Sequence, residues 1–248
     1  MPRSGLARVL SKLGVCSRSR AGTLIRQARV SVDGRIARDP EEPTDPDTER
    51  ITVDGVAVTR TPRVYIALNK PRGLIVSAAD EHGRDTVYSL LDSAQLPWVA
   101  PVGRLDKASE GLLLFTNDPE WAAGITDPAH GLTKTYHVQV HPIPDDRSLG
   151  ALVGGVLDAG ERLAAVEARV LRSGQKNAWL EIVLDEGRNR QIRRLLDALG
   201  YEVLRLVRVA IGPLELGRLA KGQWRTLSDE EIDSLSARKP QPRRSPAR

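Results

Sequence analysis

Two short segments near the N-terminus carry apolar side chains at the spacing of an amphipathic helix. In the first they are Leu6, Val9, Leu10 and Leu13. In the second they are Ala21, Leu24, Ile25 and Ala28. Ser4 and Ser17 precede these segments and can cap them, and Gly14 can end the first. The pattern predicts two compact helices.

Short alternating runs follow the two predicted helices. Residues 30–36 and 51–58 each contain an Asp-Gly pair between apolar positions, which predicts two β-hairpins. Residues 39–50 are rich in Pro, Asp and Glu and are predicted to form an exposed loop. Residues 59–63 are the expected linker. We therefore predict a small helical and hairpin domain over residues 1–60.

The rest of the chain alternates strand and helix patterns irregularly. Strands are predicted at 64–68, 74–77, 112–116, 133–141, 166–171, 179–184 and 203–211. Helices are predicted at 86–91, 119–125, 145–153, 189–199 and 229–235, with Asp118 and Ser228 as caps. This order favours an α+β domain over residues 61–236, with a mixed, mostly antiparallel sheet flanked by helices. The Pro- and Arg-rich tail, 237–248, is predicted to be disordered.

The distribution of charge along the chain indicates a polyanion as a candidate partner. The chain has a net charge of +5 and a pI near 9.6, a balance that suits a polyanion. Residues 1–38 hold nine basic side chains and one acidic one, a local excess of +8. Four arginines decorate the second helix: Arg18, Arg20, Arg26 and Arg29. They form either an RNA-facing surface or a solvated helix face.

Several classes of protein are disfavoured by composition. Cys16 is the only cysteine, so no disulfide forms within the chain, which fits a reducing cytoplasm. The four histidines form no helical metal pair, and we expect no metal. No run of about 18 apolar residues is present, so we expect no membrane span.

One carboxylate stands out as a candidate nucleophile. Asp106 lies in a loop marked by Gly103, Arg104 and Lys107, just before the apolar strand at 112–116. A carboxylate beside a rigid strand can be presented in a fixed position. A solvated or turn-capping aspartate is the alternative interpretation.

Four segments in order strengthen the first interpretation. They are Asn-Lys-Pro-Arg-Gly at 69–73, the run 103–118, Lys-Thr-Tyr at 134–136 and Glu-Gly-Arg-Asn-Arg-Gln-Ile-Arg-Arg at 186–194. Together they resemble the bacterial ribosomal RNA pseudouridine synthases of the RsuA/RluB type. The resemblance runs from about residue 3 to about residue 236. The two helices and hairpins at the N-terminus resemble the S4 RNA-binding domain that often precedes this catalytic domain.

The resemblance implies roles for particular side chains. Asp106 would attack the target uridine, Arg193 would hold its carboxylate, and Tyr136 would stack on the flipped base and assist proton removal. Lys70, Arg104 and Lys107 would contact phosphates, Leu184 would lie against the base, and Arg190 would be a further substrate contact. A guanidinium favours an ionised carboxylate and fixes its orientation. The alternatives are a core position for Tyr136 and Leu184, and a solvated surface for Lys107 and the arginines.

The predicted reaction is the isomerisation of uridine to pseudouridine in ribosomal RNA, with no cofactor because the product has the same atoms. Asp106 would attack the anomeric carbon or promote loss of the neighbouring proton, and both schemes stay open. The sequence of residues 111–118 resembles large-subunit relatives more, although small-subunit relatives share nearly the same motif. Expected partners are ribosomal RNA or a pre-ribosomal particle, bound by a cytoplasmic monomer. The alternative is a non-catalytic RNA-binding ribosome-assembly factor.

Overall fold

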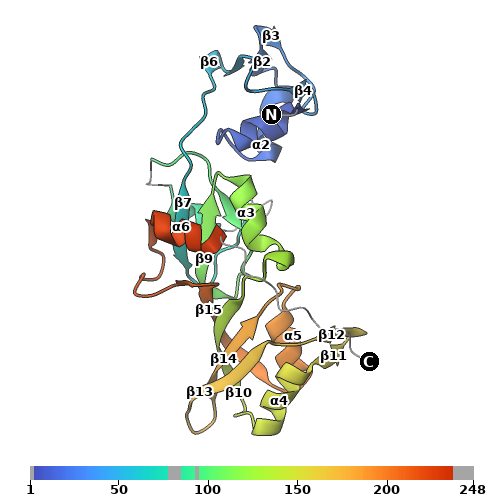
Figure 1. Cartoon of the computed structure of the whole chain (residues 1–248), viewed down its shortest axis with the longest axis vertical. Helices are drawn as coiled ribbons and strands as arrows, with labels where there is room; N and C mark the ends of the chain where they lie inside the picture. The colour runs from blue at the N-terminus through green and yellow to red at the C-terminus, as the bar shows by residue number, and fades with distance from the viewer. Residues whose placement is uncertain (1–2, 78–84, 93–94, 237–248) are drawn as a thin grey trace.

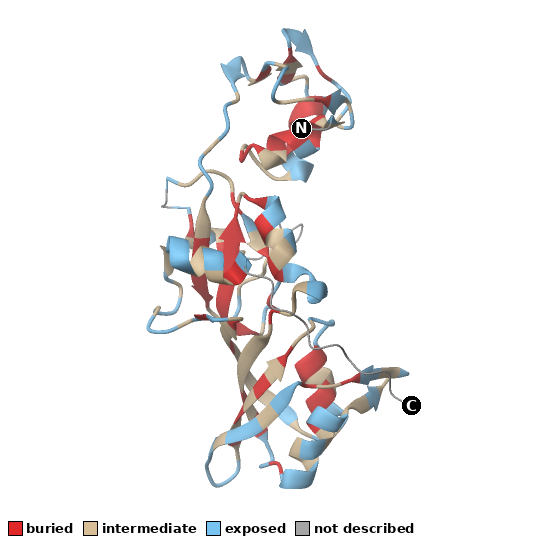
Figure 2. Cartoon of the chain, in the orientation of Figure 1, coloured by how far each residue is buried: buried red, intermediate tan, exposed pale blue. Residues whose placement is uncertain are grey.

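The computed structural model describes residues 3–77, 85–92 and 95–236. Figure 1 shows an elongated molecule. The N-terminal module lies at one end, a half containing α3 and α6 lies in the middle, and a half containing α4 and α5 lies at the other end. Each part has its own buried cluster of apolar side chains, and Figure 2 shows these buried segments at the centre of each part.

The N-terminal module contains the two predicted helices and the two predicted hairpins. The helices are α1 (Leu6–Lys12) and α2 (Arg18–Arg26). The four-stranded sheet has the order β3 (Arg35–Ile36), β2 (Val30–Val32), β5 (Ile51–Val53) and β6 (Val56–Ala57). The Ser17 hydroxyl accepts a hydrogen bond from the backbone N–H of Arg20, so the cap predicted for α2 is confirmed.

Two predictions for this module are wrong. Ser4 does not cap α1, because it lies in a short strand, β1 (Ser4–Gly5), that pairs with β4 (Pro43–Thr44). The same pairing takes part of the predicted exposed loop into the module, where Thr44 is buried. Two-residue strands carry too little periodicity to be recognised before their partner is known.

The larger sheet has the path β13, β14, β10, β15, β9, β7, β17, with β16 added to β15 and β8 added to β9. In chain order the strands are β7 (Tyr65–Lys70), β8 (Ala100–Val102), β9 (Glu110–Thr116), β10 (Lys134–His141), β13 (Glu167–Ser173), β14 (Ala178–Leu184), β15 (Glu202–Ile211), β16 (Leu214–Glu215) and β17 (Trp224–Thr226). Only β9 and β15 pair in parallel among the described strands. The predicted mixed, mostly antiparallel sheet is confirmed.

Helices cover the sheet as predicted, with short additions. The α-helices are α3 (Pro119–Thr126), α4 (Asp146–Gly154), α5 (Gln191–Asp197) and α6 (Asp229–Ser236). The short helix predicted at 86–91 is a 3₁₀ turn, Val87–Leu90. The additions are a second 3₁₀ turn, Pro128–His130, and a hairpin of β11 (Val156–Asp158) and β12 (Glu161–Leu163). Asp118 and Ser228 accept hydrogen bonds from the first turns of α3 and α6, as expected. The strand predicted at 74–77 is wrong: only a single bridge joins Ile75 to Thr86. The predicted disordered tail lies outside the described residues.

The joint between the two halves of the sheet is narrow. The parallel pairing of β9 and β15 consists of Val207 with Glu110 and Arg208 with Gly111. Gly111 has a φ of +103°, and a Cβ there would lie 2.2 Å from the carbonyl oxygen of Arg208. Only glycine permits this approach. The joint brings the loop that precedes β9 beside β10, β15 and the start of α5.

Candidate active site

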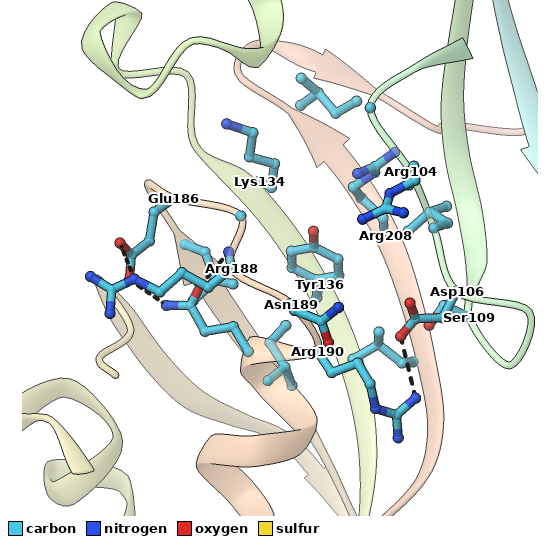
Figure 3. Close-up of a pocket in the computed structure, with 18 of the residues that line it drawn as sticks. Arg104, Asp106, Ser109, Lys134, Tyr136, Glu186, Arg188, Asn189, Arg190 and Arg208 are labelled. Carbon is cyan, nitrogen blue, oxygen red and sulfur yellow. Dashed lines mark hydrogen bonds and ion pairs between the residues drawn. The ribbon is translucent and has the colours of Figure 1, made fainter. Parts of the chain in front are cut away.

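A cavity of about 370 Å³ opens at this joint (Figure 3). Six of the residues singled out from the sequence line it: Arg104, Asp106, Tyr136, Leu184, Arg190 and Arg193. Its lining holds six basic side chains and two acidic ones. Such an excess of positive charge in a concave site favours an anionic ligand.

Asp106 is held at the edge of the cavity by an ion pair with Arg190. The Nη1 atom of Arg190 lies 3.6 Å from Oδ2 of Asp106, and both side chains are about half exposed. Arg190 has a left-handed backbone with a φ of +49° and occupies the N-cap position of α5. The helix predicted to begin at Asn189 therefore begins at Gln191, because a left-handed residue cannot continue an α-helix. An unusual backbone at a cavity edge is typical of functional positions.

Arg193 holds the loop that carries Asp106, and the ion pair predicted for it is made by Arg190 instead. Its Nη2 donates to the carbonyl of Ala108 and its Nη1 to the carbonyl of Val203, each at 3.3 Å. Burial and the nearby Arg190 lower the pKa of Arg193, whereas Asp106 acts in the opposite direction. Arg193 is thus close to the carboxylate but bonded to backbone.

The prediction of a phosphate contact for Lys70 is wrong, because the side chain is fully buried. Its Nζ donates to three backbone carbonyls: Pro71 at 3.1 Å, Asp106 at 3.2 Å and Ser109 at 2.9 Å. Burial lowers the pKa of Lys70 to about 8, while Asp106 and Glu110 act in the opposite direction. Lys70 therefore fixes the backbone of the Asp106 loop from beneath.

Tyr136 and Leu184 take part in both the core and the cavity. Tyr136 is half-buried on β10, packs against the clusters of both halves, and projects its ring into the cavity (Figure 3). Leu184 is buried on β14, opposite Lys134, and also lines the cavity. The core and substrate interpretations of these two residues are compatible.

Lys107 and Arg104 are both exposed. Arg104 lines the cavity, whereas Lys107 is not among the lining residues. The carbonyl of Lys107 accepts a hydrogen bond from the N–H of Gly73, at 2.8 Å. The 69–73 segment therefore supports the Asp106 loop through its backbone as well as through Lys70.

Sequence reasoning assigned no role to several charged residues at the joint. Arg208 and Lys134 line the cavity, and Glu110 is buried beside it with Arg205 and Lys221 as partners. Burial raises the pKa of Glu110, but hydrogen bonds from Lys221 and Arg205 outweigh this and leave it below its usual value. Arg208 had a recognisable signal in the sequence, because it is a charged residue within the mainly apolar run of the strand predicted at 203–211.

The N-terminal arginines differ from one another. Arg18 pairs with Glu41 at 2.9 Å, and Arg29 forms a bidentate pair with Asp54. Arg20 and Arg26 are exposed and have no acidic partner in the part of the chain that the structure describes. Over residues 1–60 there are eleven basic and eight acidic residues, a net charge of +3. The acidic segment after residue 38 offsets much of the basic excess.

Comparisons with known proteins agree with this arrangement. The family model described as RNA pseudouridylate synthase matches residues 64–198, and the S4 domain model matches residues 5–49. A crystal structure of a pseudouridylate synthase superposes with a TM-score of 0.64 at 31% identity, covering 95% of this chain and all of that chain.

Named relatives extend over nearly the whole sequence. Ribosomal large subunit pseudouridine synthase B of Bacillus subtilis is 35% identical over 234 residues, 94% of this chain and 95% of its own length. An uncharacterized RNA pseudouridine synthase of Aquifex aeolicus is 37% identical over 227 residues, 91% of each chain. The chain therefore belongs to the RNA pseudouridine synthase family and carries an N-terminal S4 domain. It is an enzyme of that class. No described helix is long and apolar enough to cross a membrane.

Proposed function

We propose that this enzyme converts uridine to pseudouridine in ribosomal RNA of the large subunit, with Asp106 as the nucleophile. The observation that supports this proposal most strongly is the position of Asp106. It lies on a loop fixed by Lys70 and Arg193 at the edge of a basic cavity. The large-subunit assignment is supported by the similarity to the Bacillus subtilis enzyme along nearly its whole length.

The reaction breaks the glycosidic carbon–nitrogen bond, turns the uracil over and forms a carbon–carbon bond. Asp106 either attacks the anomeric carbon and is displaced later, or takes the neighbouring ribose proton and returns it. In both schemes the proton on uracil C5 is lost at the end and N1 gains one. Atoms and electrons balance within the substrate, so the reaction needs no cofactor.

The cavity residues divide the remaining tasks. Tyr136 offers a flat ring on which the flipped pyrimidine stacks, and it assists removal of the C5 proton. Leu184 closes the pocket against the base. Extruding a base from its stack costs a few kcal/mol, which contacts to the surrounding phosphates offset. Arg104 and Arg190 supply such contacts from the cavity rim, and Lys107 supplies one from the loop surface.

The N-terminal module supplies RNA affinity in this proposal. S4 domains bind RNA, and the exposed Arg20 and Arg26 on α2 offer charges that no described acid compensates. We propose that the substrate is ribosomal RNA or a pre-ribosomal particle. We also propose that the enzyme acts in the cytoplasm, as a monomer.

Mapping pseudouridines in ribosomal RNA tests the function. A strain lacking this gene is complemented with the wild type or with Asp106→Asn. We expect the deletion to lose pseudouridine at a large-subunit position, and only the wild type to restore it. An unchanged map would contradict the proposed reaction and favour a non-catalytic RNA-binding assembly factor. Restoration by Asp106→Asn would instead contradict the assignment of Asp106 as the nucleophile.

A further inference from the structure

Arg208 is a buried charge that faces the cavity and has no acidic partner among the residues that the structure describes. It is 6% exposed, and its Nε donates to the carbonyl of Leu112 at 2.7 Å. Its Nη2 is buried and has no hydrogen-bond partner among the described residues. A guanidinium does not lose its proton at ordinary pH, so burial cannot be relieved by neutralisation. A buried charge without a partner is unfavourable, and it persists where a ligand completes the site.

Two further cations lie at the same end of the cavity. In Figure 3 Lys134, Arg104 and Arg208 lie around the end toward which the Tyr136 hydroxyl points. Lys134 donates to the carbonyl of Leu132, and burial and then Arg208 lower its pKa, with Asp185 acting in the opposite direction. The positive charges of Arg208 and Lys134 therefore repel each other across the cavity.

The acids of the cavity are engaged elsewhere. Asp106 pairs with Arg190, and Glu186 is bonded to Arg188 and Gln191. The lining therefore leaves Arg208 without a carboxylate of its own. An anion that enters with the substrate is the partner that this end lacks.

We propose that Arg208, with Lys134 beside it, binds the phosphate of the target nucleotide. This subsite rests on the proposed function. Arg208 lies directly opposite Tyr136 in the pairing of β10 with β15. A nucleotide whose base stacks on Tyr136 therefore has its backbone within reach of the neighbouring strand. A guanidinium fork with an adjacent ammonium matches the charge of a phosphate better than it matches a neutral uracil carbonyl.

Titration of the full-length protein with small probes tests the subsite directly. The Nε–H signal of Arg208 is assigned in the NMR spectrum through Arg208→Lys and followed during addition of inorganic phosphate, uridine 5′-monophosphate and uridine. We expect phosphate and the monophosphate to shift it with saturation, and uridine alone to leave it unchanged. A response to uridine equal to that of the monophosphate would show that Arg208 reads the base and overturn the proposal.

A variant separates this role from a structural one. Arg208→Met removes the charge and keeps much of the volume, and Arg218→Met, at an exposed position, is the control. We expect Arg208→Met to keep or raise Tm and to weaken binding of the monophosphate roughly tenfold or more, the loss typical of a charged hydrogen bond. A lowered Tm with unchanged binding would overturn the proposal. Binding is measured without turnover, so a protein that binds phosphate but makes no pseudouridine refutes only the proposed function.

Discussion

Arg190 and Asp106 form an ion pair with 3.6 Å between Nη1 and Oδ2, although Arg190 lies outside the helix that was expected to present it. Three residues further on, Arg193 bonds to the carbonyls of Ala108 and Val203. One arginine thus contacts the carboxylate and the other contacts the backbone of its loop. The two interactions have different consequences for activity and stability.

Substituting the two arginines separately should reveal this division. Arg190→Ala removes an exposed ion pair, and such pairs contribute about 0–1 kcal/mol to stability. Its Tm should stay within about 2 °C of the wild type while kcat falls, because the carboxylate loses its orienting partner. Arg193→Ala should lower both kcat and Tm, since it frees two carbonyls and leaves a cavity. Thermal melts and single-turnover assays of both variants provide the check. Equal Tm values with equal losses of activity would contradict the division.

The lowered pKa of Lys70 predicts that the activity of the enzyme falls at alkaline pH, so that its pH profile has an alkaline limb. Its folded pKa of about 8 lies below the usual lysine value, 10.5, so between these values the unfolded state binds more protons. The contribution of Lys70 to the free energy of unfolding therefore rises with pH through that window. Activity should instead fall as the pH rises through the same window. The reason is that a neutral amine bonds more weakly to the carbonyls of the Asp106 loop.

The Lys70→Met variant provides the control for this pH dependence. It has no group to titrate at that position, and it should be less active at pH 7 while losing the alkaline limb near pH 8. Single-turnover rates of both proteins between pH 6.5 and 9.5 measure the effect. An identical alkaline limb in Lys70→Met would assign the titration to another group.

Local signals in the sequence predicted much of this structure, and long-range contacts account for the rest. Ser17 and Asp118 act within one helical turn, so their caps were recognisable. In the sequence, Lys70 stands beside a proline and is typical of a turn residue. In the structure, β7 places its side chain beneath the Asp106 loop, 36 residues further along the chain. The left-handed backbone of Arg190 and the pairing of β9 with β15 likewise depend on distant segments. Six of the candidate residues line one cavity, whereas the contacts that each of them makes were not predicted.

The four N-terminal arginines, three on α2 and Arg29 just after it, should not contribute equally to RNA binding. Arg20→Gln with Arg26→Gln removes two uncompensated charges, so affinity for ribosomal RNA fragments should fall. The salt dependence of log K should flatten by about 1–2. Arg18→Gln with Arg29→Gln should have a smaller effect, because Glu41 and Asp54 already pair with these charges. Titrations at several salt concentrations compare the pairs. Equal slopes for both double variants would refute the assignment.

The central claim is that Asp106 performs the chemistry, and single-turnover pseudouridine formation by purified Asp106→Asn tests it most directly. The substitution keeps the size of the side chain and removes its charge, so RNA affinity, measured in parallel, should stay within about twofold of the wild type. We predict no product above background at enzyme concentrations that saturate the RNA. Product formation at a rate within about tenfold of the wild type would contradict the claim.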